Sequence, residues 1–454
     1  MRGDIKYVAT VIFSSAYRSV TQQIEGDILL DRITNYLEEK LQPVMDVLST
    51  NRYLTAIQHG FFGAMPVMVI GSIFLLLSNF PVEGYVDFMA SIFGENWANF
   101  FTVPFNMSMN ILSLFIFFGI VKSLADHYKV DAIGALVVSL VGFLILNPTI
   151  LSEDGAAGIS MSHLGSGGLF LAIISAILAV EIYRWVVQSG WTIKMPDTVP
   201  AAVSRSFTSL IPGTFVIVIF NIIRLLFEMT PFGTAYDFIY GVLQAPLTNI
   251  GGTLWGVLLV IFIESFLWAF GIHGSSVVSA GLGAVMLSLT AENAEAFLAG
   301  QPIPNIVNQQ FLAIFVNIGG SGATIGLVLL CLFFAKSRQL NLLGKISIGP
   351  GIFMINEPVI FGVPMVLNPV MMIPLIFVPV IMGLLTYFVM SIGLVPLTNG
   401  ANIPWTTPPI IGGFLLSGWQ GAVFQVFQII FSMALYYPFF KIEDNKALEL
   451  EMNE

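Results

Sequence analysis

Residues 349–369 read Gly349-Pro350-Gly351-Ile-Phe-Met-Ile-Asn356-Glu357-Pro358-Val-Ile-Phe-Gly362-Val-Pro364-Met-Val-Leu-Asn368-Pro369. The stretch is apolar enough to lie in a membrane, but its prolines and glycines would interrupt a spanning helix several times. Irregular backbone at membrane depth is tolerated only where protein or a water-filled cavity surrounds it. We therefore expect a re-entrant segment that lines a cavity. Glu357 marks the candidate functional site, because a carboxylate in an apolar run is costly to bury.

The composition of the whole chain is that of a membrane protein. Of 454 residues, 56% are hydrophobic and only 10% are charged, whereas soluble domains carry roughly 25% charged residues. The only cysteine, Cys331, lies in an apolar run, so neither a disulfide nor a cysteine-based metal site is expected. No glycine-rich Walker sequence is present, which excludes nucleotide hydrolysis by that route. We expect no metal, no cofactor and no nucleic-acid partner.

The N-terminal region divides into two parts. Residues 1–28 show no periodicity and are an extension of unknown role. In residues 29–48 apolar side chains recur at helical spacing, which predicts an amphipathic helix. This helix would lie on the membrane surface, or alternatively would be solvated and packed on the protein itself.

Apolar segments of about 20 residues predict the membrane spans. They lie near residues 54–78, 105–122, 132–148, 168–188, 208–228, 252–272, 308–334, 371–393 and 414–438. A weaker segment covers residues 275–289.

The distribution of basic residues decides whether the weak segment crosses. Five connections contain no Lys or Arg: 79–104, 149–167, 229–251, 290–307 and 394–413. Loops with Lys or Arg alternate with loops that contain neither, as the positive-inside rule requires, only if residues 275–289 also cross the membrane. The sequence therefore predicts an all-α polytopic membrane protein with about ten transmembrane helices, two re-entrant hairpins and both termini in the cytoplasm.

A second broken segment follows the ninth span. Residues 395–409 mix prolines, amides and Trp405 and carry no basic residue, which favours a hairpin that dips in from the outside. Two broken segments in one half of a chain often build a transporter's midplane binding site. We therefore predict a five-helix scaffold domain, with the amphipathic helix, over 29–250. A transport domain would cover 251–440 and a cytoplasmic tail 441–454.

The end of the sixth span carries further candidate site residues. Trp268 and His273 are five residues apart, so both could reach one cavity if the glycines nearby loosen the helix end. His273 can change protonation near neutral pH, although it could instead hydrogen-bond a backbone carbonyl at the helix terminus. Glu264, in the middle of the span, is either a second site group or a structural acid bonded to a neighbouring helix.

Tryptophans, amides and acids together suggest the class of ligand. Trp268 and Trp405 offer flat apolar surfaces for the C–H faces of a sugar, although Trp commonly anchors proteins at the membrane interface. Amides such as Asn356 and Asn402, together with carboxylates, would bind the hydroxyl groups. This inventory suits a neutral sugar.

Two motifs resemble the membrane-spanning IIC component of bacterial sugar phosphotransferase systems, most closely the lactose/cellobiose/diacetylchitobiose branch. The first is Asn356-Glu357-Pro358 with its flanking glycines and prolines, and the second is Trp268-Ala-Phe270-Gly271-Ile272-His273-Gly274. The resemblance covers about residue 30 to the C-terminus.

The resemblance implies a homodimer in the bacterial cytoplasmic membrane, with the first five helices at its interface and a transport domain that moves as a unit. It implies that Glu357 binds the hydroxyl of a disaccharide that is to be phosphorylated. His273 would lie beside Glu357, and Trp268 and Trp405 along the sugar. A separate soluble IIB protein, phosphorylated by an upstream IIA, would supply a phosphocysteine. No fused IIB or IIA domain is recognised in this sequence.

Two other classes of function remain open from the residues alone. In an ion-coupled sugar symporter or facilitator, Glu357 and His273 would bind a proton. In a membrane enzyme, a pair of carboxylates would be catalytic, although the spacing offers little support. These classes differ in whether the sugar arrives chemically modified and only when a phosphorylated partner is present. The sequence leaves open whether the disaccharide is of the cellobiose or diacetylchitobiose type.

Overall fold

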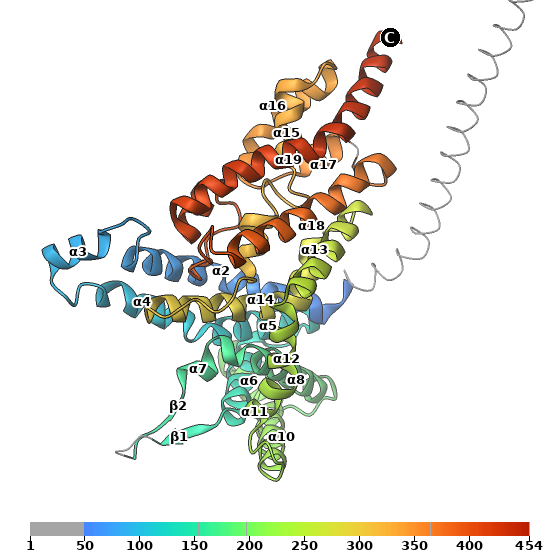
Figure 1. The fold of residues 1–454 in the computed structure, drawn as a ribbon. Helices are drawn as coiled ribbons and strands as arrows, with labels where there is room; N and C mark the ends of the chain where they lie inside the picture. The colour runs from blue at the N-terminus through green and yellow to red at the C-terminus, as the bar shows by residue number, and fades with distance from the viewer. Residues whose placement is uncertain (1–49, 152–154, 197, 364, 454) are drawn as a thin grey trace, which may run out of the picture.

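The computed structural model describes residues 50–151, 155–196, 198–363 and 365–453 (Figure 1). The predicted extension over 1–28 and the predicted amphipathic helix over 29–48 lie outside the described residues. The described chain is almost entirely helical, and its one small sheet is an antiparallel hairpin of β1 (Thr149–Leu151) and β2 (Ala157–Ile159).

The first half of the described chain is a packed group of helices with short surface helices between them (Figure 1). Its elements are α2 (Arg52–Ser78), α3 (Tyr85–Phe93), α4 (Asn99–Met109), α5 (Leu112–Tyr128), α6 (Ala132–Leu146), α7 (Met161–Leu164), η1 (Ser166–Gly168), α8 (Leu169–Gln188), α9 (Ala201–Thr208), α10 (Leu210–Glu228), α11 (Ala235–Ile239), the π-helix η2 (Tyr240–Gln244) and α12 (Ala245–Gly251).

The second half contains more interruptions. Its elements are α13 (Leu254–Ala269), α14 (Gly274–Leu298), the π-helix η3 (Phe311–Val316), α15 (Ile325–Phe334), α16 (Arg338–Ile352), α17 (Glu357–Gly362), α18 (Pro369–Ser391) and α19 (Ile411–Asn453), which bends at Ser417 and Gly418. The predicted tail over 441–454 is, as far as residue 453, the helical end of α19.

The helical membrane architecture is confirmed, but the count of ten crossings is not. Among the described residues, seven helices are long and apolar enough to span. The count is eight if the helical run Ala235–Gly251 (α11, η2 and α12) and α13, which are bent by 82°, belong to one span. α6 and α15 have 15 and 10 residues and fall short of the usual length. The weak segment 275–289 lies within α14, which has 25 residues and is among the seven.

The predicted unbroken span over 308–334 is wrong. The π-helix η3 ends at Val316, and α15 begins only at Ile325. Between them lies a glycine-rich loop, residues 317–324, in which Gly319, Gly320 and Gly322 have φ angles of +80°, +99° and +95°. A continuous α-helix cannot contain such angles, and glycine adopts them at little cost.

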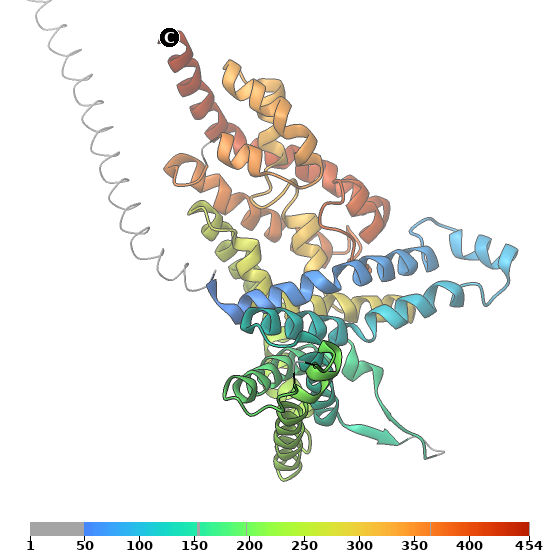
Figure 2. The same cartoon turned by 180° about the vertical axis from the view of Figure 1, so that it is seen from behind.

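A helical hairpin lies just upstream of the predicted re-entrant stretch, and the two re-entrant hairpins predicted over 349–369 and 395–409 stay predictions. α15 and α16 lie side by side and return the chain on itself (Figures 1 and 2). The stretch 349–369 is interrupted as predicted, because it holds the end of α16, the short α17 and the start of α18.

Side chains on one face of α19 complete the interrupted backbone. Four polar residues, spaced three or four positions apart, donate hydrogen bonds to carbonyl oxygens of η3 and the glycine-rich loop. The pairs are Gln425 with Ile314, Gln428 with Phe315, Ser432 with Ala323 and Tyr436 with Gly322, at 2.7 to 2.8 Å. Carbonyls that a regular helix would pair internally are therefore paired by a neighbouring helix, as burial in a membrane protein demands.

Two hydrophobic clusters form the core. The first joins the helices of the first half with parts of α13, α14, η3 and residues 390–424. The second joins α15, α17, α18 and the distal part of α19, with Trp268 at its margin. α14 also contacts α2 directly, since Gln58 Nε2 donates to the carbonyl of Ser276 at 2.5 Å. The predicted boundary at residue 250 stays a prediction.

Replacing Gln425 with Leu should destabilise the protein. The amides of Ile410 and Gly413 and the carbonyl of Ile314 would all lose their partner, and each unsatisfied buried group costs about 1–3 kcal/mol. We expect a lower melting temperature of the detergent-purified protein, measured by intrinsic fluorescence. Gln188→Leu, at the exposed end of α8, is the matched control. An unchanged melting temperature for Gln425→Leu would contradict this role.

Candidate functional site

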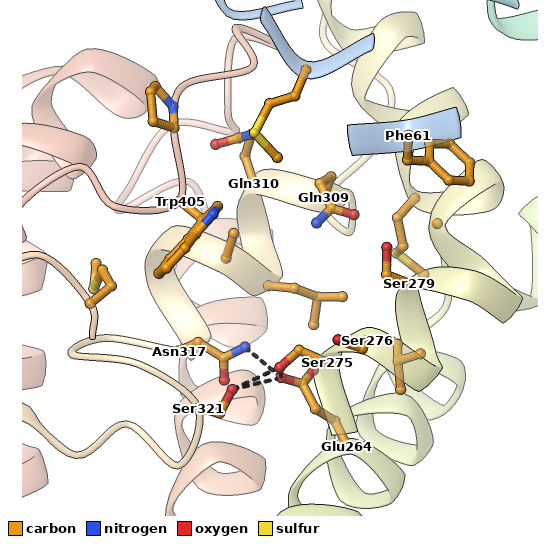
Figure 3. A pocket seen from close by; sticks show the side chains of 18 of the residues that line it. Phe61, Glu264, Ser275, Ser276, Ser279, Gln309, Gln310, Asn317, Ser321 and Trp405 are labelled. Atoms are coloured by element: carbon orange, nitrogen blue, oxygen red, sulfur yellow. Dashed lines mark hydrogen bonds between the residues drawn. The ribbon is translucent and has the colours of Figure 1, made fainter. Parts of the chain in front are cut away.

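A cavity of about 390 Å³ lies between the two halves of the chain (Figure 3). Cavities that bind small molecules range from about 300 to 1,000 Å³. α2, the junction of α13 and α14, η3 and residues near 354–357 and 402–405 supply its walls. All six residues predicted to form the site line this one cavity: Trp268, His273, Asn356, Glu357, Asn402 and Trp405.

Glu357 is the first residue of α17, directly after Asn356. Its side chain is exposed in the cavity wall, so the expectation of a carboxylate buried among apolar groups is wrong. The reason is that the break between α16 and α17 lies beside the cavity rather than inside the packed core. Among the described residues, no group donates a hydrogen bond to its carboxylate. Both oxygens can therefore accept hydrogen bonds from a ligand.

His273 caps the N-terminus of α14. Its Nδ1 accepts a hydrogen bond from the Ser276 amide at 3.3 Å and lies 2.9 Å from Ser276 Oγ. Gly271, with a φ of +79°, makes the tight connection that places this imidazole after α13. Because Nδ1 accepts, the neutral ring carries its hydrogen on Nε2, which can donate to a ligand. The residue is thus a helix cap and a cavity group at once.

The two predicted tryptophans, Trp405 and Trp268, differ in burial. Trp405 is 46% exposed and stands in the cavity (Figure 3). Trp268 is only 5% exposed, and its ring centroid lies 4.7 Å from that of His273. Trp268 also packs in the second hydrophobic cluster. Trp405 therefore faces the cavity, as expected. Trp268 also lines the cavity, but most of its ring is packed in the core.

The two predicted amides are both hydrogen-bonded to neighbouring segments. Asn356 Nδ2 donates to the carbonyl of Ser321 at 2.6 Å and to Thr324 Oγ1 at 3.1 Å. Asn402 accepts from Gln310 Nε2 at 2.5 Å through Oδ1, and its backbone amide donates to Ser72 Oγ at 2.6 Å. Substrate binding by Asn356 and Asn402 stays a prediction.

Sequence reasoning missed one wall of the cavity. Phe61, Met65 and Met68 of α2 line it, although α2 was assigned to the scaffold alone. These residues gave no signal, because apolar side chains are ordinary in a spanning helix. Gln309 and Gln310 also line the cavity and could have been found, since adjacent amides in an apolar segment are unusual.

Glu264 is the buried carboxylate of the site. Its side chain is 5% exposed, and its Oε1 accepts from Ser275 Oγ at 2.7 Å, Asn317 Nδ2 at 3.0 Å and Ser321 Oγ at 3.2 Å (Figure 3). Glu264 is therefore bonded to a neighbouring helix, α14, as one of the two alternatives expected. It also lines the cavity, and its role in the site stays a prediction.

The chain is similar to known proteins in both sequence and structure. The family model described as "Phosphotransferase system, EIIC" matches residues 58–379. The lichenan permease IIC component of Bacillus subtilis (strain 168) is 41% identical over 433 residues, covering 93% of this chain and 96% of that protein. The cellobiose-specific EIIC component of Geobacillus stearothermophilus is 40% identical over 434 residues, covering 92% and 96%. The crystal structure of ChbC, the IIC component from the N,N'-diacetylchitobiose-specific phosphotransferase system, is 42% identical with a TM-score of 0.88, covering 92% of this chain and 100% of that one.

Replacing each tryptophan with alanine should distinguish a role in sugar binding from a role in core packing. Trp405→Ala should weaken binding of the expected disaccharide about tenfold, or about 1.4 kcal/mol, without lowering the melting temperature. Trp268→Ala should weaken binding and also lower the melting temperature, because it removes a ring from the core. Titration calorimetry and thermal unfolding of the same preparations measure both effects. If Trp405→Ala aggregates in detergent, Trp405 is a packing residue and the assignment fails.

Proposed function

Because the chain belongs to the phosphotransferase system EIIC family, we propose that it carries a disaccharide of the cellobiose or diacetylchitobiose type across the membrane. A separate IIB protein would phosphorylate the sugar at this site. The observation that carries the proposal is the convergence of Glu357, His273 and Trp405 on one cavity of suitable size. Exposed acceptors, an imidazole donor and a flat apolar ring match the hydroxyls and C–H faces of a neutral sugar.

The proposed reaction transfers a phosphoryl group from a cysteine sulfur of IIB to a sugar hydroxyl. The S–P bond breaks as the O–P bond forms, and the carboxylate of Glu357 takes the hydroxyl proton. Nε2–H of His273 donates to the same hydroxyl or its neighbour and holds the sugar in line with the donor. The lack of any described hydrogen bond to Glu357 supports this role, since its oxygens are available for the hydroxyl.

We place the IIB protein on the side where the C-terminal end of α19 meets the tip of the α15–α16 hairpin (Figure 1). Asp444 joins the two, accepting from the amides of Lys336 and Ser337 at about 2.9 Å. Lys336, Arg338 and Lys441 lie there, and basic residues gather on the cytoplasmic side of membrane proteins. Both termini are accordingly proposed to lie in the cytoplasm of a bacterium.

We further propose a homodimer formed through the first five spans, with the later helices moving as a unit. α10 supports an interface, because only 22% of its spanning window is buried within one chain, less than for any other described span. Few polar contacts tie α2 to the second half, among them Gln58 with Ser276 and Ser72 with Asn402. A small number of such contacts can break and reform as the site changes the side it faces.

Vesicles that contain the purified protein should accumulate phosphorylated disaccharide only when phosphorylated IIB is enclosed. Glu357→Gln keeps the shape of the side chain but removes the base, so we expect at least a hundredfold slower phosphorylation. Labelled cellobiose and diacetylchitobiose, followed by chromatography of the vesicle contents, measure this. Glu95→Gln, an exposed acid between α3 and α4 that takes part in none of the described ion pairs, is the matched control. Unmodified sugar inside vesicles without IIB would instead show an ion-coupled or facilitating transporter, and near-normal phosphorylation by Glu357→Gln would refute its role.

Cross-links should reveal which parts move. In a Cys331→Ala background, a reducible thiol cross-linker between Phe80→Cys, just after α2, and Phe414→Cys on α19 should stop uptake, and reduction should restore it. The centroids of the two rings lie 6.1 Å apart and neither residue lines the cavity, so the bridge restrains movement without filling the site. The same reagent between His59→Cys and Ser123→Cys, whose Nδ1 and Oγ atoms lie 2.8 Å apart within the scaffold, should leave uptake running. Continued uptake with the first pair bridged would place the start of α19 with the scaffold and refute the proposed division.

A further inference from the structure

Glu264 has no role in the transfer described above, yet it is the better buried of the two carboxylates among the described lining residues. None of the described ion pairs includes it, and no lysine or arginine is among the described lining residues. A carboxylate buried without a cation is expensive unless hydrogen bonds compensate for the lost water. Its place in the structure therefore depends on the groups that donate to it.

Those donors come from two separate segments. Ser275 lies in the first turn of α14, whereas Asn317 and Ser321 lie in the glycine-rich loop, and all three donate to Oε1. Glu264 itself lies on α13. One oxygen atom therefore joins two helices to a loop that has no regular structure of its own (Figure 3).

The opposite side of the glycine-rich loop supports the motif that carries Glu357. Asn356 Nδ2 donates to the carbonyl of Ser321 at 2.6 Å, and the amide of Gly319 donates to Met354 Sδ at 2.9 Å. A Cβ atom on Gly320 would lie 2.5 Å from Asn356 Cγ, so backbone and side chain are in direct contact. Any displacement of the loop must therefore displace Asn356 and the residue that follows it.

We propose that Glu264 is a positioning residue of the phosphorylation site. By accepting hydrogen bonds through Oε1, Glu264 fixes the position of the glycine-rich loop. The loop in turn fixes the positions of Asn356 and Glu357. The inference rests on the proposed function, because its effect is exerted on sugar binding and phosphoryl transfer. It assigns Glu264 the task of an acceptor and requires neither contact with the sugar nor transfer of a proton.

Two substitutions of Glu264 distinguish a role as a hydrogen-bond acceptor from a role that requires its negative charge. Glu264→Gln keeps a carbonyl oxygen at the same reach but removes the charge, whereas Glu264→Leu has similar bulk and no acceptor. Positioning through Oε1 predicts that the Gln variant retains function and that the Leu variant loses it. A direct role in binding a proton or in charge-dependent recognition predicts that both variants lose it.

The experiment measures disaccharide binding by calorimetry and IIB-dependent phosphorylation between pH 6 and 9. We expect Glu264→Gln to bind within about threefold of the wild type, with an unchanged pH profile. Glu264→Leu should bind at least about tenfold more weakly, since Asn317 loses its acceptor and only one of the Ser275 and Ser321 hydroxyls, which lie 2.8 Å apart, can donate to the other. Equal impairment of the two variants, or an altered pH profile for Glu264→Gln, would overturn the proposal.

A second measurement applies if Glu264→Leu does not purify as a folded protein. Ser321→Ala keeps the carboxylate and removes one donor, while Asn356→Ala releases the other side of the loop. We expect each to weaken binding several-fold and the double variant to be less impaired than the product of the two effects. Ser391→Ala, an exposed hydroxyl at the end of α18, is the control. Independent effects of Ser321→Ala and Asn356→Ala would overturn the proposal, whereas failure of the wild type to bind any disaccharide would overturn the proposed function.

Discussion

Every backbone amide and carbonyl at membrane depth needs a partner inside the protein, and this requirement shapes the whole fold. An α-helix meets this demand within itself, but a cavity that must present backbone turns and polar side chains cannot be built from helices alone. Here the chain leaves helical geometry at residues 317–324. The carbonyls released by that break are paired by side chains of α19, among them Gln425 and Tyr436.

The same demand explains the polar groups around the cavity. The side-chain amide of Asn356 donates its hydrogens to the glycine-rich loop, and Nδ1 of His273 accepts from the first turn of α14. Glu264 occupies the junction between α13, α14 and the loop, where several donors converge. The groups left available for a ligand include the exposed carboxylate of Glu357, Nε2 of His273 and the face of Trp405. The hydrogen bonds of Asn356 and of His273 Nδ1 fix the backbone that carries Glu357 and His273, as the proposed phosphoryl transfer requires.

The cavity also links the two halves of the chain. Phe61, Met65 and Met68 of α2 form an apolar wall opposite the polar groups of the second half. In the movement proposed above, the second half would slide along this wall, which makes no directional bonds. The polar contacts across this boundary, such as that between Ser72 and Asn402, are then the ones that would have to exchange during transport.

Local composition and short motifs such as Asn356-Glu357-Pro358 were enough to predict a helical membrane protein and to select six residues that line one cavity. The break within 308–334, the exposure of Glu357 and the burial of Glu264 became visible only in the folded chain. The exposure of Glu357 depends on where the cavity lies, whereas the break and the buried acid depend on hydrogen-bond partners far away in the sequence. Gln425 lies 111 positions from Ile314, and Ser321 lies 57 from Glu264, so no local pattern records the pairing.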